Sequence, residues 1–74
     1  MKDQKAILTK CLKNDWPAFV ISGTDVCAVE AMEAYLEIAK QKGCNQAFLS
    51  DMQLVIDEMR HFQEEEPEHI KIPD

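Results

Sequence analysis

The stretch from Thr24 to Gly43 constrains the fold most, because both of its ends carry helix signals and its apolar residues cover a wide arc. Thr24 or Asp25 can accept a hydrogen bond from a free N–H of a first helical turn, and Gly43 tolerates the left-handed conformation that ends many helices. On a helical wheel the apolar residues span about 220°, against about 100° for an ordinary surface helix. The sequence therefore predicts a central helix over 25–42. Its apolar residues are Cys27, Ala28, Val29, Ala31, Met32, Ala34, Tyr35, Leu36, Ile38 and Ala39.

Two further segments have the helical period. A helix near residues 3–13 places four apolar side chains on one face and the lysines at positions 2, 5, 10 and 13 on the other. Pro17 lies shortly after this segment and prevents the helix from continuing. Asn45 can cap a helix over 46–63, whose apolar residues recur at the 4-3-4-3 spacing of a core face. The short connection at 43–45 makes the second and third helices antiparallel neighbours. The predicted core-facing residues are Ile7, Leu8, Cys11 and Leu12 in the first helix, and Phe48, Met52, Val55, Met59 and Phe62 in the third.

Two segments outside the helices are expected to be extended. Residues 19–22 contain three large β-prone side chains and are predicted to be buried. Pro67 interrupts the tail over 64–74, and Ile70 and Ile72 alternate there as in an edge strand. The two segments could pair as a minimal two-stranded sheet. The expectation is a mainly α single domain over 1–74, in which the helix 25–42 is sandwiched between the other two.

Length and charge exclude several classes of function. The chain has 74 residues and a net charge of −6, and no apolar run approaches the ~18 residues of a membrane span. An acidic protein is poorly suited to bind nucleic acid through its phosphates. The charged first ten residues lack the apolar core of a secretory signal, so a soluble, cytoplasmic protein is expected. The N-terminal segment is basic and the C-terminal end acidic, so the two ends could attract one another.

Candidate metal ligands occur but do not form a recognisable pattern. Cys11, Cys27, Cys44 and His61 are spread over separate elements without a CxxC pair, so we expect reduced thiols rather than a zinc site. The first two cysteines are expected to face the core. Glu58-x-x-His61 has the spacing of di-iron carboxylate bundles, yet on the wheel it points away from the apolar stripe. No metal or cofactor is predicted.

The sequence also lacks a catalytic constellation. Glu30, Glu33 and Glu37 recur at helical spacing and indicate a solvated helix face rather than paired catalytic carboxylates. The segment Ser22–Asp25 could in principle bind phosphate at a helix N-terminus, but it has one glycine and an aspartate that would repel the anion. We therefore predict a protein that is not an enzyme, with no catalytic residues.

Five residues are candidates for partner binding. Trp16 is the predicted anchor, because tryptophan is enriched in interface hot spots, although it could instead pack as a lid on the core. Leu54 falls on the polar side of the third helix, where an apolar side chain has no core to join. Glu64, Glu65 and Glu66 form an acidic run. Such a run could serve a decoy that mimics nucleic acid.

Most of the chain has a family resemblance. The stretches that carry it are PAFVISGTDVCAVEAMEAYLEIAK and FLSDMQLVIDEMRHFQEEEPEHIKIPD, which lie within residues 17–74. They resemble small proteins carried by conjugative transposons and related mobile elements of gut bacteria. The resemblance implies a bacterial cytoplasmic setting and a mobile-element origin, and it supplies no activity, cofactor or site residues.

Two functions remain open on these observations. The first is a small accessory module of a mobile genetic element that binds a protein partner, because a small charged domain with little room for a pocket offers mainly its surface. The alternative is an acidic decoy that inhibits a DNA-binding enzyme by mimicking nucleic acid. The basic segment 3–13 counts against the decoy, since a mimic needs acidic groups over much of its surface. The oligomeric state is left open.

Overall fold

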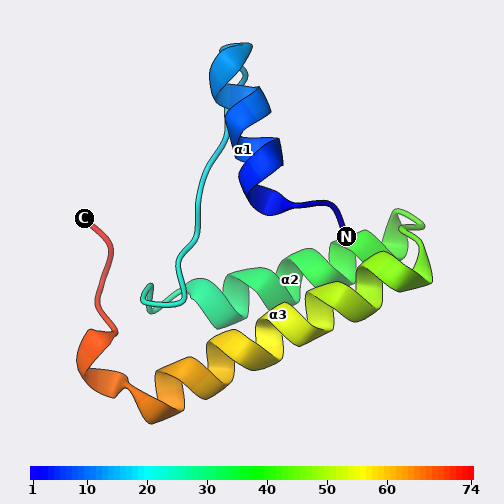
Figure 1. The fold of residues 1–74 in the computed structure, drawn as a ribbon. Helices are drawn as coiled ribbons and strands as arrows, with labels where there is room; N and C mark the ends of the chain where they lie inside the picture. The colour runs from blue at the N-terminus through cyan, green and yellow to red at the C-terminus, as the bar shows by residue number, and fades with distance from the viewer.

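The computed structural model describes residues 1–74 and is mainly helical, as predicted. It contains α1 (Gln4–Lys13), α2 (Ala28–Gln41), α3 (Gln46–Glu65) and a 3-10 turn, η1 (Pro67–His69). The helices α2 and α3 run antiparallel side by side as a helical hairpin, and α1 stands away from them (Figure 1). No helix is both long and apolar enough to cross a membrane.

The connection between α2 and α3 confirms two sequence signals. Gly43 has a φ of +79°, and the N–H of Cys44 donates to the carbonyl of Ala39 at 3.0 Å. This is the left-handed helix end for which glycine is favoured. The side chain of Asn45 then accepts a hydrogen bond from the N–H of Phe48 at 2.8 Å and caps α3. Backbone chemistry therefore fixes where the hairpin turns.

The core lies in the seam between α2 and α3. Leu36, Met52 and Ile56 are buried there, with exposed fractions of 5%, 4% and 0%. The alanines Ala28 and Ala39 of α2 are also buried. The predicted α3 stripe did not include Ile56, which lies four residues after Met52 and so shares its face. Five of the 74 residues are buried, which is a small core even for a chain of this length.

The tail docks beside the start of α2, in a register that differs from the prediction. Lys71 forms a single parallel bridge with Asp25, and there is no strand. The predicted pairing of Phe19–Ile21 with Ile70–Ile72 is therefore wrong. The side-chain amide of Gln63 donates to the carbonyls of Gly23 and Asp25 at 3.1 and 2.9 Å, and so ties the end of α3 to the same turn.

This docking also explains why α2 begins at Ala28 and not at Thr24 or Asp25. The N–H of Val26 donates to the carbonyl of Lys71, and the N–H of Lys71 donates to the carbonyl of Thr24. The carbonyl of Thr24 is therefore occupied by the tail, whereas in a helix capped at Thr24 it would accept the first intrahelical hydrogen bond. Asp25 still acts as a local cap, because its carboxylate accepts the N–H of Cys27 at 2.7 Å. The third helix, in turn, extends to Glu65, two residues beyond the predicted end.

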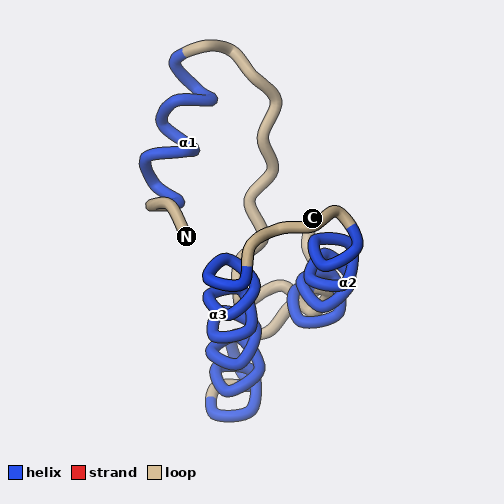
Figure 2. The backbone as a smooth tube through the Cα atoms, turned by 90° about the vertical axis from the view of Figure 1, so that its right-hand side faces the viewer, coloured by secondary structure: helices blue, strands red, loops and turns tan.

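The predicted sandwich is wrong, because α1 does not pack on α2. No Cα atom of α1 lies within 8 Å of a Cα atom of α2 or α3. Figures 1 and 2 show α1 separated from the hairpin in two perpendicular views. One side of the wide apolar arc of α2 therefore faces α3, and the rest is left uncovered. Cys27, expected in the core, is exposed, as are Tyr35 and Ile38.

Candidate protein-binding surface

The N-terminal arm, which we define as residues 4–22, consists of α1 and the extended segment after it. Asp3 caps α1 by accepting the N–H of Lys5 at 2.9 Å. At the other end Asp15 has a positive φ of 56°, and the N–H of Trp16 donates to the carbonyl of Cys11 at 2.9 Å. This pattern is the Schellman helix end, with an aspartate in the place usually taken by glycine. It turns Trp16 back alongside the helix.

Trp16 lies on the arm and is exposed, as an interface anchor would be. Its side chain is 53% exposed, and the ammonium of Lys10 lies 5.8 Å from the ring centroid. A cation at this distance from a tryptophan face is attracted by about 0.5–1 kcal/mol at an exposed site. The contact orients the indole but does not bury it. Trp16 is therefore no lid on the core.

The rest of the arm exposes large apolar side chains. Leu12, Phe19 and Val20 are 72%, 85% and 67% exposed. The expectation that residues 19–21 are buried is therefore wrong for Phe19 and Val20, while Ile21 is half-buried. The physical reason is that no residue from 17 to 21 makes a backbone hydrogen bond, so no backbone pairing holds this segment against the hairpin. The arm has an apolar surface without a partner inside the chain.

One ionic contact joins the beginning of the chain to the hairpin. The N-terminal ammonium of Met1 pairs with the carboxylate of Asp51 on α3. Beside it lies an open hollow whose apolar lining comes from Met1, Ile7, Ala47 and Phe48. This hollow is where the start of the arm comes nearest to α3. Because a single exposed ion pair contributes only about 0–1 kcal/mol, it does not fix the position of α1.

The hairpin carries a matching uncovered region, which we call the open face. Tyr35 and Ile38 on α2 are 49% and 51% exposed. Tyr35 packs at 6.4 Å, centroid to centroid, against Phe48 on α3, which also lines the hollow beside Met1. The open face, formed by Tyr35, Ile38 and Phe48, therefore adjoins the place where the arm begins.

The size of the molecule reflects this missing contact. Its accessible surface is 5952 Å², whereas a compact monomer of 8.5 kDa is expected to expose about 4,700 Å². Its radius of gyration is 13.5 Å, against about 11 Å for a compact domain of this length. The surplus of about 1,300 Å² is comparable to one partner's share of a stable interface, which is about 800 Å².

Charge is divided between the start of the chain and the rest of it. Residues 1–16 contain four lysines and two aspartates, while residues 17–74 contain twelve acidic and four basic side chains. The arm is therefore positive and the hairpin negative. Such a division favours association of an arm with a hairpin and makes that association sensitive to salt.

The remaining predicted site residues lie elsewhere. Leu54 is 61% exposed on α3, on the same side as the exposed Glu58 and His61. Glu64 and Glu65 are exposed in the last turn of α3, and Glu66 follows it. Figure 1 places this end of α3 far from the C-terminal end of α1, after which Trp16 follows. The structure therefore does not bring the predicted anchor together with the acidic run.

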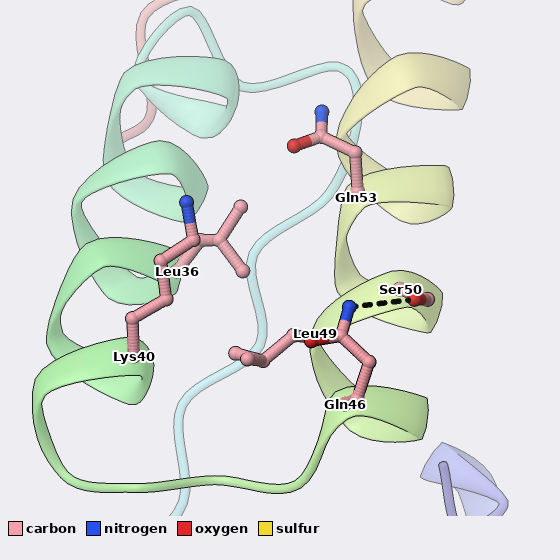
Figure 3. Close-up of a pocket in the computed structure, with 6 residues that line it drawn as sticks. All are labelled: Leu36, Lys40, Gln46, Leu49, Ser50 and Gln53. Atoms are coloured by element: carbon pink, nitrogen blue, oxygen red, sulfur yellow. Dashed lines mark hydrogen bonds between the residues drawn. The ribbon is translucent and has the colours of Figure 1, made fainter.

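The seam between the helices contains a second hollow, of about 430 Å³. Figure 3 shows Leu36 on α2 and Leu49 and Gln53 on α3 projecting toward one another across the seam. The amide of Gln46 donates to the hydroxyl of Ser50 at 3.3 Å, and Lys40 pairs with Glu37 at 3.2 Å. The lining offers hydrogen-bonding groups without a carboxylate, an imidazole or a thiol. The full lining is Leu36, Lys40, Gln46, Leu49, Ser50 and Gln53.

The thiols and candidate metal ligands are dispersed. The carboxylate of Asp25 raises the pKa of the neighbouring Cys27 thiol, which makes this exposed cysteine a weaker nucleophile at neutral pH. The four residues considered as zinc ligands do not come together. The group that does is Glu66, Glu68 and His69 around η1, all exposed, with ligand atoms within 4.8 Å of one another. Exposed acidic groups of this kind are common without an ion.

Three residues of the surface were missed by sequence reasoning. Leu12 was assigned to a core face, and Phe19 and Val20 to a buried segment. The sequence did contain a warning for Phe19 and Val20. The run from Trp16 to Val20 has neither the alternation of a strand nor the period of a helix, so its pattern gave no reason to predict that it is buried.

Comparisons with known proteins do not assign the chain to a family. No protein-family model matches the sequence, and no curated protein or solved structure is similar enough to match it.

Proposed function

We propose that this protein is a small non-enzymatic accessory module that acts by binding another protein chain, and that it belongs to a mobile genetic element. The observation that carries the binding function is the arm, which presents large apolar side chains with no partner in its own chain. Patches of this kind mark interaction sites when they are contiguous. The mobile-element setting is supported by the resemblance of residues 17–74.

A capture experiment tests the binding function. The tagged protein is expressed in a bacterial host that carries the corresponding mobile element, and co-purifying proteins are quantified by mass spectrometry. We expect Trp16→Ala to reduce recovery of a specific partner at least ~10-fold, because desolvated aromatic anchors dominate such interfaces. Circular dichroism should remain unchanged, since Trp16 contributes nothing to the seam between α2 and α3. Full recovery with Trp16→Ala and with Leu54→Ala would contradict the proposal.

The acidic decoy is the second candidate, and the exposed run Glu64–Glu66 favours it. A decoy would work through charge, so its binding should fall steeply between low and moderate salt. Changing the three glutamates to glutamine should then abolish capture while both apolar substitutions leave it intact. The partner in that case should be a basic nucleic-acid enzyme. If the protein is instead a protein-binding module, the apolar substitutions should abolish capture and the three glutamine substitutions should leave it intact.

A further inference from the structure

We propose that the arm's partner is a second copy of this chain, with each arm lying on the open face of the other copy. The inference rests on the proposed protein-binding function and specifies whom the arm binds. Each copy gives its arm to the other and receives the other's arm, so two chains related by a two-fold axis form a closed dimer. It would cover Leu12 and Phe19 of each arm and Tyr35 and Ile38 of each hairpin.

The area of exposed surface fits a dimer. Each copy exposes 5952 Å², about 1,300 Å² above the expectation for a compact monomer. A stable interface takes about 800 Å² from each partner. Every copy has both an arm and an open face, so a dimer that exchanges arms covers both of these surfaces on each chain. A different protein would need to supply both a matching helix and a matching face.

Charge complementarity also points to a second copy. The arm carries Lys5, Lys10 and Lys13, while the hairpin is strongly acidic. Asp51, on α3 near the open face, already pairs with a positive group from the chain's own N-terminus, the ammonium of Met1. Glu58 lies seven residues further along α3, on the same side of the helix, and is exposed. An incoming basic arm would find this row of carboxylates beside the apolar contact.

The connection between arm and hairpin permits the exchange. Residues 17–21 make no backbone hydrogen bond, and no Cα atom of α1 lies within 8 Å of a Cα atom of α2 or α3. Little therefore has to be broken for an arm to reach another copy. Exchange of an element between identical chains is a low-cost route to a dimer.

Sedimentation velocity on the purified full-length chain tests the inference. At about 100 μM chain, a concentration that populates a micromolar complex, we expect a species of twice the 8.5 kDa monomer mass. Leu12→Asp on the arm or Ile38→Asp on the open face should each raise the dimer dissociation constant at least ~10-fold, because each places a charge in an apolar contact. Ile72→Asp is the control, because Ile72 is 82% exposed in the C-terminal tail and belongs to neither the arm nor the open face. It should leave the dissociation constant unchanged. Thermal unfolding verifies that each variant keeps its helical hairpin.

A mixing experiment tests the arm-to-face contact itself. A Leu12→Asp copy keeps an intact open face, and an Ile38→Asp copy keeps an intact arm. Their mixture can form one of the two contacts, so it should associate more tightly than either variant alone. Association no tighter in the mixture, an equal loss with Ile72→Asp, or a monomer at all concentrations would each overturn the inference. A monomer whose Trp16-dependent capture of a different protein persists would overturn the dimer and leave the proposed function standing.

Discussion

Ile56→Ala should unfold a large fraction of the protein at physiological temperature. Ile56 is fully buried at the centre of the cluster with Leu36 and Met52. Truncation of a buried isoleucine costs about 2–5 kcal/mol, the sum of lost burial and the cavity left behind. A chain of this length is expected to be stable by only about 4–11 kcal/mol, and the small core favours the lower part of that range.

Chemical denaturation followed by circular dichroism measures this loss. Leu54→Ala is the matched control, because it shortens an apolar side chain on the same helix that is 61% exposed. It should change the unfolding free energy by less than about 0.5 kcal/mol. Equal losses for the two variants would mean that α3 presents a different face to α2.

Leu36→Ala should produce the second large effect, again about 2–5 kcal/mol. Leu36 is 5% exposed and belongs to the same cluster as Ile56. The loss in the double variant should therefore differ from the sum of the single losses, because neighbouring residues share one cavity.

Glu33→Ala provides the comparison on α2. The carboxylate of Glu33 pairs with the guanidinium of Arg60 at 2.7 Å, the one side-chain ion pair between α2 and α3. Both side chains are about half exposed, so this pair should contribute at most about 1 kcal/mol. Thermal unfolding of the two variants compares apolar and ionic stabilisation of the same seam. A loss of unfolding free energy with Glu33→Ala as large as that with Leu36→Ala would show that the ion pair stabilises the seam as much as apolar packing does.

The hairpin was predictable because its signals are local. Gly43 and Asn45 act through the backbone of their own turn, and the spacing of Met52, Val55 and Met59 reports a helix face whatever it packs against. The start of α2 was not predictable in the same way. It depends on Lys71, which is distant in sequence and occupies the carbonyl of Thr24.

The placement of α1 illustrates a different limit. A wide apolar arc on α2 predicts that the helix has more than one neighbour, but it does not say whether that neighbour belongs to the same chain. For Trp16 the sequence left two placements open, an interface anchor and a lid on the core, and the structure shows the side chain 53% exposed. The exposure of Leu12 and Phe19 was not predicted, because helical period and β-propensity describe local shape, while burial depends on which other elements the segment packs against.

Amide hydrogen exchange of the dilute protein tests the central claim, that α1 does not dock on the hairpin of its own chain. A free helix of ten residues is marginally stable in water. We therefore predict that the α1 amides exchange at nearly unprotected rates at low concentration, while those of α3 around Ile56 exchange orders of magnitude more slowly. Raising the chain concentration should slow exchange in α1. Protection of α1 equal to that of α3 in the dilute monomer would contradict the account.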